Sequence, residues 1–288
     1  MTQHYFRYIF ALLLFGTNGI VASHIRLSSY EIVFWRTLIG SGLLICLFFL
    51  TRQKPTFQKH RRDLIFIVLS GISMGASWIF LYEAYARIGV SLASLAYYCG
   101  PVIVMILSPV IFKEKLTAEK VIGFLLVLGG IFLVNGRSSH MDIGRWGLLC
   151  GLLSAVMYAL MVMLNKQTRQ VKGLENASIQ LLASFLTVAV FTVLKTGGSL
   201  SIPSGDMPWI VVLGLLNTGA GCYLYFSSIG SLPVQTVAIL GYLEPLSAVL
   251  LAVLLLNEVM LPLQMLGAIL IIGGAVFGER ARLRPKAG

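Results

Sequence analysis

A lone carboxylate in a long apolar stretch, Glu244, is the side chain best placed to do chemistry. It stands near the middle of the apolar stretch 234–256 and is followed by Pro245. At the centre of a membrane helix a charge costs about 2.5–3.5 kcal/mol, so such a carboxylate faces a cavity, pairs or is protonated. We expect Glu244 to carry a proton or to bind a substrate amine. The alternative is a neutral acid bonded to the carbonyl of Gly241, which Pro245 deprives of its backbone donor.

Two further charges adjoin apolar stretches and are candidates for a gate or for coupling, together with Glu244. Glu83 precedes Arg87 by four residues, which predicts either a local ion pair on one helix face or a second carboxylate at an outer gate. Arg36 lies just inside the stretch 31–50. Its long side chain either reaches the membrane interface or faces a cavity and pairs at the gate.

Aromatic and amide side chains are the other candidate substrate ligands. Trp78 and Tyr82 are four residues apart and share one helix face. Such residues line binding pockets or populate membrane interfaces. Asn18 and Asn217 predict either hydrogen bonds between helices or contacts in a cavity. The predicted pocket residues are Trp78, Tyr82, Tyr97, Tyr98, Tyr158, Tyr242, Asn18, Asn217 and Glu244.

The chain lacks the sequence motifs of cofactor and metal chemistry. It has no Walker A sequence, which excludes ATP hydrolysis by this chain, and no His/Glu metal motif or nucleophile elbow. Its four cysteines fall in apolar stretches without metal-ligand spacing. We therefore expect no cofactor, no metal and no enzymatic reaction.

These residues belong to a chain that is too apolar to fold in water alone. Apolar types make up 57% of its 288 residues and charged types 11%, against about 25% charged in a soluble domain. The composition therefore predicts an all-α polytopic membrane protein. Ten apolar segments can each cross a bilayer as a helix: 5–23, 31–50, 64–85, 90–112, 119–136, 146–165, 176–194, 208–228, 234–256 and 262–278.

The distribution of basic residues predicts the orientation. Sixteen of the 22 Lys and Arg residues fall on one side when ten spans are threaded from a cytoplasmic N-terminus. Since cytoplasmic loops are enriched in these residues, both termini should be cytoplasmic. The positive net charge of +11 therefore indicates membrane topology, and we expect no nucleic-acid partner.

The two halves of the chain repeat one another. An offset of 144 residues aligns 75–134 with 219–278 and pairs Tyr98 with Tyr242 and Glu114 with Glu258, among others. Each half has five spans, so the second is inverted, and such repeats form a substrate site near the midplane. We expect repeats over 1–137 and 138–288, with Glu114 and Glu258 bracing hairpins. The predicted hinges are Pro101, Pro245, Gly75 and Gly219.

The segments 97–130 and 241–274 carry a family resemblance. In each, a proline precedes a glutamate by thirteen residues and a glycine-rich helix follows. The chain resembles the EamA-type permeases of the drug/metabolite transporter superfamily. That resemblance implies a ten-helix bacterial inner-membrane exporter of amino acids and related metabolites, with a cavity between the halves.

We therefore expect a secondary active exporter of small amphipathic metabolites that works by alternating access. Protons are a candidate coupling ion, and one chain is sufficient to enclose a cavity, although an oligomer stays open. Uptake of a quaternary amine or another small solute is the first alternative. A membrane scaffold or lipid-processing protein without a solute path is the second.

Overall fold

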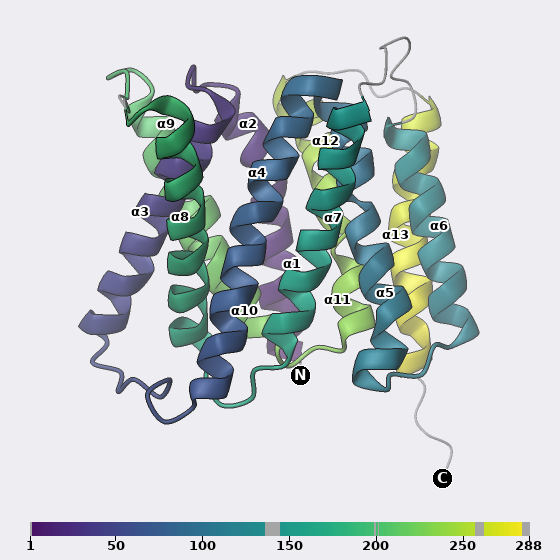
Figure 1. The fold of residues 1–288 in the computed structure, drawn as a ribbon. Helices are drawn as coiled ribbons and strands as arrows, with labels where there is room; N and C mark the ends of the chain where they lie inside the picture. Colours follow the sequence, from purple (N-terminus) through teal and green to yellow (C-terminus); the bar gives the residue numbers. More distant parts are fainter. Residues whose placement is uncertain (1, 136–144, 199, 201, 257–261, 284–288) are drawn as a thin grey trace.

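The computed structural model of the chain describes residues 2–135, 145–198, 200, 202–256 and 262–283, and within these it contains helices and no strand. Figure 1 shows them running between two faces of the molecule. The helices are α1 Thr2–Gly16, α2 Asn18–Ala22, α3 Ser29–Leu50, α4 Arg61–Tyr97, α5 Cys99–Phe112, α6 Ala118–Asn135, α7 Arg145–Lys166, α8 Gly173–Thr196, α9 Met207–Val212, the π-helix η1 Leu213–Ala220, α10 Gly221–Ile229, α11 Val234–Leu240, α12 Leu243–Leu256 and α13 Pro262–Leu283.

Grouped across their breaks, these helices give the ten transmembrane helices that the sequence predicts. Breaks divide the first, eighth and ninth predicted spans into α1–α2, α9–η1–α10 and α11–α12, and a break at Tyr98 divides the fourth between the end of α4 and α5. Six stretches are long and apolar enough to cross a membrane: Gln3–Ala22, Ser29–Leu50, Arg61–Ile88, Arg145–Lys166, Gly173–Thr196 and Met207–Ile229. Shorter apolar helices, Cys99–Phe112 and Met265–Gly274, belong to the remaining passes.

The third and fourth predicted spans, 64–85 and 90–112, are joined by continuous helix. Helix α4 continues from Arg61 to Tyr97. A Cβ atom built on Gly151 would lie 2.7 Å from the Cβ of Ala96 and 3.9 Å from that of Ala84. Twelve residues of straight helix span about 18 Å, so the chain reverses between Ala84 and Ala96 while it stays helical.

Two helix breaks stand at positions related by the 144-residue offset. Tyr98 separates α4 from α5, and the pair 241–242 separates α11 from α12. Each break lies just before a proline, Pro101 or Pro245, whose ring displaces the carbonyl four residues earlier. The carbonyl of Gly241 accepts the backbone N–H of Glu244 at 3.3 Å, so it is not unpaired, and the predicted bond from the Glu244 carboxyl is not found there.

The inverted repeat appears as reciprocal contacts between α6 and α13, which lie side by side at one end of the molecule (Figure 1). A Cβ on Gly130 would lie 2.5 Å from the carbonyl oxygen of Gly267. A Cβ on Gly274, the counterpart of Gly130, would lie 2.6 Å from that of Gly123, the counterpart of Gly267. Exchanging each glycine for its counterpart in the other half therefore turns one contact into the other, as expected for two inverted repeats related by a twofold axis. The boundary between the predicted repeats lies in 136–144, outside the described residues.

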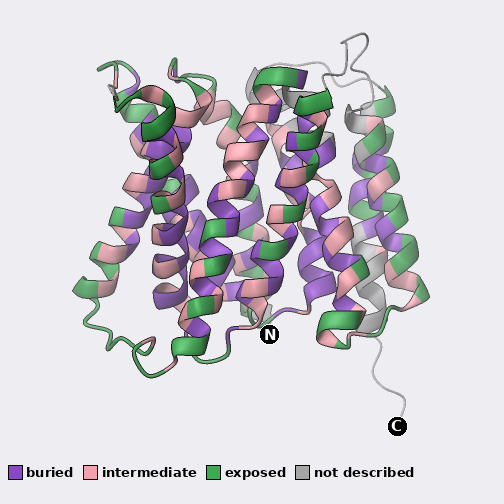
Figure 2. Ribbon diagram, viewed as in Figure 1, coloured by how far each residue is buried: buried purple, intermediate pink, exposed green. Residues whose placement is uncertain are grey.

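The two faces of the molecule differ. The terminal face carries the N-terminus and the connections 51–60, 113–117 and 230–233, and the far face carries 23–28 and 202–206 (Figure 1). Figure 2 shows exposed residues along the helices between the two faces. Many of the exposed residues are large and apolar, which suits contact with lipid. Examples are Phe49, Leu125, Phe132 and Ile269.

Carboxylates close the terminal face by accepting backbone N–H groups of other segments. The Glu114 carboxylate accepts the N–H groups of Val234 and Gln235 at 2.8 and 3.3 Å, at the start of α11. A negative charge is favourable at a helix N-terminus. The sequence suggested that Glu114 braces its own hairpin, but these hydrogen bonds join the two halves instead. Its counterpart Glu258 lies outside the described residues.

Two more carboxylates act in the same way on this face. Asp63 accepts the backbone N–H groups of 169–171 at 2.9, 2.6 and 3.1 Å. Glu175 accepts those of 56–57 at 2.7 and 2.9 Å. The connections of the terminal face are therefore held to the helix bundle through their backbones.

The α6–α13 contact makes a prediction with a matched control. Gly130→Ala and Gly274→Ala should each destabilise the protein by about 1–3 kcal/mol, because the added methyl meets a backbone oxygen that cannot turn aside. Cβ atoms on the neighbours Gly129 and Gly273 would meet nothing within 4 Å. Thermal unfolding in detergent measures the difference. Equal unfolding temperatures for Gly130→Ala and Gly129→Ala would show that the contact is not tight.

Candidate functional site

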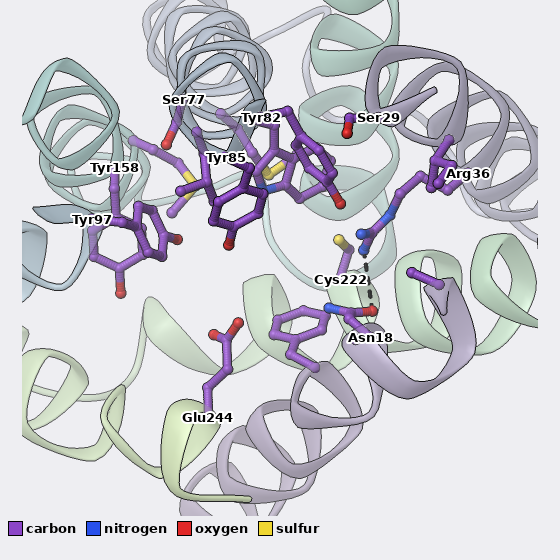
Figure 3. A pocket seen from close by; sticks show the side chains of 18 of the residues that line it. Asn18, Ser29, Arg36, Ser77, Tyr82, Tyr85, Tyr97, Tyr158, Cys222 and Glu244 are labelled. Atoms are coloured by element: carbon purple, nitrogen blue, oxygen red, sulfur yellow. Dashed lines mark hydrogen bonds between the residues drawn. The ribbon is translucent and has the colours of Figure 1, made fainter. Parts of the chain in front are cut away.

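A cavity of about 570 Å³ lies within the bundle and is lined by both halves of the chain. Figure 3 shows its side chains converging from the surrounding helices. Residues of the sequence-predicted site in its lining are Asn18, Arg36, Trp78, Tyr82, Tyr97, Tyr98, Tyr158 and Glu244, from α2, α3, α4, the break between α4 and α5, α7 and α12.

Glu244 stands in the first turn of α12 and projects into this cavity (Figure 3). It follows directly on the break 241–242, so the break aims its side chain inward. Among the residues that the structure describes, no side chain forms a hydrogen bond or ion pair with its carboxylate. Facing it across the cavity are the rings of Tyr97 and Tyr158 (Figure 3). The carboxyl is therefore available to a proton or to a cationic group in the cavity.

Arg36 is 5% exposed and holds a fixed position in the wall of the cavity. Its Nε donates to the hydroxyl of Thr218 at 2.8 Å, and Nη2 donates to the side-chain oxygen of Asn18 at 3.4 Å. Its guanidinium also lies 5.0 Å from the centre of the Trp78 ring. The structure thus supports the cavity-facing alternative, because an arginine reaching the membrane interface would be exposed.

The partners of Arg36 come from irregular backbone. Thr218 belongs to the π-helix η1, where its hydroxyl donates to the carbonyl of Leu213 at 2.8 Å. That bond leaves the lone pairs of the hydroxyl to accept Nε of Arg36. Asn18 begins α2, directly after the break at Thr17. Single-turn π-helices occur frequently at functional sites.

The aromatic side chains form a continuous wall. The ring of Tyr97 lies 5.7 Å from that of Tyr98 and 5.4 Å from that of Tyr158, and the Tyr158 hydroxyl lies 3.5 Å from that of Tyr225. These rings offer faces to a cation and hydroxyls to polar groups. Tyr82 points into the same space from α4 (Figure 3).

Two predicted ligands lie outside the cavity lining and repair helix breaks. The Asn217 amide donates to the carbonyl of Leu14 at 2.9 Å and to the Thr17 hydroxyl at 2.6 Å. The Tyr242 hydroxyl donates to the carbonyl of its counterpart Tyr98 at 2.8 Å. For Asn217 the hydrogen bond between helices, which was the first of the two readings of the sequence, is the one observed.

The two predicted glycine hinges are sites of close helix contact between the halves. A Cβ on Gly75 would lie 2.8 Å from the carbonyl oxygen of Ser184 in α8, and one on Gly219 would lie 2.7 Å from Leu43 in α3. Gly219 also faces Gly40, which is the counterpart of Ser184 at the same offset of 144. Hinge motion at these glycines, and at Pro101 and Pro245, stays a prediction.

Glu83 lies near the far face and makes the local ion pair that was the first of its two predicted readings. It forms the expected ion pair with Arg87 at 3.0 Å, but it also pairs with Lys195 of α8 at 3.1 Å and accepts the hydroxyl of Tyr30. The Lys195 ammonium lies 3.9 Å from the centre of the Tyr30 ring. Glu83 thereby ties α3, α4 and α8 together, and its role as a gate stays a prediction.

Several lining residues were not predicted. Tyr85 continues the helix face of Trp78 and Tyr82 at i+7, so the periodicity of α4 contained a signal for it. Cys222 comes from α10, where the break at η1 changes the helix register and obscures any such pattern. Other lining residues that were missed are Phe15, Met74, Ser77, Leu81, Met161 and Phe226.

The cavity reaches one face of the molecule. Its lining extends from Glu244 to Ala22, Ser29 and the exposed Ala86, which adjoin the connections of the far face. Toward the terminal face lie the buried core and a network of buried amides. In that network the Asn165 amide donates to Asn176 and Gln180 at 2.9 and 3.0 Å, and the Gln180 amide donates to Ser70 at 2.8 Å.

Comparison with known proteins finds relatives over most of the chain. Residues 5–136 and 145–278 each match the EamA-like transporter family. An uncharacterized transporter, YxxF of Bacillus subtilis, is 24% identical over 246 residues, which cover 84% of this chain and 78% of that protein. A probable terminal-alkyne amino-acid exporter of Streptantibioticus cattleyicolor is 26% identical over 231 residues, which cover 78% and 76%. One crystal structure shares the fold, with a TM-score of 0.82 at 17% identity over 97% of this chain and 98% of the other.

The bond between the two repeat-equivalent tyrosines can be tested by removing one oxygen. Tyr242→Phe should destabilise the protein by about 1 kcal/mol, because the Tyr98 carbonyl at the helix break loses its donor. Tyr223→Phe is the matched control, since no partner of the Tyr223 hydroxyl occurs among the described residues. Thermal unfolding in detergent compares the two variants. Equal effects would show that the bond does not stabilise the break.

Proposed function

The chain belongs to the EamA-like transporter family, and we propose that it exports small amphipathic metabolites, amino acids foremost, from a bacterial cytoplasm. Transport would proceed by alternating access across the inner membrane. The proposal rests chiefly on one observation, a cavity that is lined by both halves, carries both charged and aromatic groups, and extends to residues beside the far face. A scaffold without a solute path has no use for such a cavity.

The bias of basic residues supports cytoplasmic termini, and with them an outward-facing conformation. The far face would then be extracellular, and the cavity would be open for release of the substrate. The amide network around Asn165 and the carboxylates Asp63, Glu114 and Glu175 would form the closed cytoplasmic side. An inward-facing state requires that some of these bonds exchange.

Energy for export would come from a gradient, since the sequence carries no nucleotide-binding motif. Glu244 is the group we assign to coupling. Its carboxylate has no protein partner among the described residues and faces the cavity (Figure 3). A proton and a substrate ammonium would compete for it, so that binding of one releases the other. This competition is the physical requirement for proton exchange against substrate.

Replacement of Glu244 tests this assignment. In proteoliposomes, Glu244→Gln should lose the pH dependence of amino-acid transport and lower apparent substrate affinity about tenfold or more, since hydrogen bonds to charged groups contribute about 1.5–3 kcal/mol. Uptake of radiolabelled leucine, driven by imposed pH gradients, gives the measurement. Unchanged pH dependence in the variant would refute the coupling role.

A matched carboxylate serves as the control. Glu31 lies in the first turn of α3 and accepts the N–H and hydroxyl of Ser28 at 3.0 and 2.6 Å. Its replacement by glutamine removes the same carboxylate charge as Glu244→Gln does. Glu31→Gln should transport as the unchanged protein does. Flux in inside-out and right-side-out vesicles compares export with uptake, and inward flux alone would replace the export proposal by uptake.

A further inference from the structure

Arg36 has an unused capacity to bind an anion. A guanidinium has five N–H donors and no acceptor. Nε is engaged by Thr218 and Nη2 by Asn18, the latter at the long distance of 3.4 Å, and both acceptors are neutral. Among the described residues, nothing accepts from Nη1, and no carboxylate lies within ion-pair distance of Arg36. Buried charges are normally paired, so this arginine lacks its counter-charge.

The environment favours a planar anion at this site. The bond from Nε to Thr218 and the Trp78 ring, 5.0 Å away, fix the plane of the guanidinium. The two Nη groups then present a fixed fork, which matches the two oxygens of a carboxylate. Both Arg36 and Asn18 line the cavity, so a solute in it has access to this fork (Figure 3).

The opposite charge stands across the same cavity. Figure 3 shows Arg36 at one side and Glu244 at another, with Tyr82, Tyr85 and Tyr158 around the space between them. The remaining lining is largely apolar, with Phe15, Met74, Leu81, Met161 and Phe226. The cavity thus offers a cationic end, an anionic end and apolar walls, and a zwitterion with an apolar side chain has the matching groups.

We propose that Arg36 binds the carboxylate of a zwitterionic substrate whose ammonium group lies toward Glu244. This inference rests on the proposed transport function and specifies its substrates. They are amino acids with a free carboxylate and an apolar side chain. Amino-acid amides and quaternary amines without an acid group bind poorly, because the desolvated guanidinium then stays unpaired.

Binding to the purified full-length protein tests the inference without a transport step. The probes are L-leucine, L-methionine and L-phenylalanine, each compared with its own amide, which keeps the ammonium and the side chain. Apparent affinity follows from the rise in unfolding temperature with probe concentration. The unchanged protein should bind at least one acid about tenfold or more tightly than its amide, and Arg36→Gln should lose this preference.

Two further variants secure the interpretation. Arg62→Gln makes the same change at an exposed arginine that lies over the Phe66 ring near the terminal face, and it should keep the preference. Arg36→Lys retains the charge but not the fork, so its preference should fall between the other two. If Arg36→Gln does not fold, Arg36→Lys decides alone: a preference equal to that of the unchanged protein refutes the carboxylate fork.

The remaining outcomes also decide. The inference is overturned if the amides stabilise the protein as well as the acids do, if Arg36→Gln keeps the preference, or if no probe binds. Counterflow of the same probes in proteoliposomes separates this result from the proposed function. Binding that depends on Arg36 but is not accompanied by flux would refute the transport function and support the carboxylate site. Flux together with an unchanged preference for acids in Arg36→Gln would support transport and refute the carboxylate site.

Discussion

Hydrocarbon offers no hydrogen bond to a peptide group, so each break in a membrane helix must be repaired from within the protein. Here the repairs run between the two halves of the chain. Asn217 donates to the Leu14 carbonyl beside the break at Thr17, Tyr242 donates to the Tyr98 carbonyl, and Tyr8 donates to the Val237 carbonyl of α11 at 2.9 Å. Three of the breaks around the cavity receive a donor from the opposite half, whereas at η1 the hydroxyl of Thr218 donates to the carbonyl of Leu213 within the same half. Cavity and interface therefore depend on the same bonds.

The breaks also place the charges. Glu244 enters the cavity because α12 restarts immediately before it, and Arg36 is held by Thr218 of the π-helix and by Asn18 after the break at Thr17. In an unbroken bundle these residues would be buried between helices or turned toward lipid, at a cost of several kcal/mol each. Irregular backbone is thus what makes two opposite charges tolerable at this depth. It also keeps them apart, so that neither neutralises the other.

Much of the fold was predictable from the sequence, because hydropathy marks the spans and the 144-residue offset marks the repeat. The resemblance to EamA-type permeases is confirmed by the family match over both halves. Less of the site was predictable. A carboxylate at mid-span singled out Glu244 and helix periodicity pointed to Trp78 and Tyr82, but the reversal of α4 between Ala84 and Ala96 was not predicted. The setting of Arg36 depends on Thr218, which is 182 residues away in the chain, and no local pattern reports such a bond.

The reciprocal glycine contacts between α6 and α13 bear on ancestry. Gly130 meets Gly267 as Gly274 meets Gly123. A single five-helix chain that inserted into the membrane in both orientations would therefore form the same helix contact with its own inverted copy. Duplication and fusion remove the requirement that the copies be identical. Position 36 carries arginine at the cavity, whereas its counterpart Gln180 carries an amide in the buried network on the other side. A pair of identical chains would have to bury that cation twice, and the fused chain buries it once.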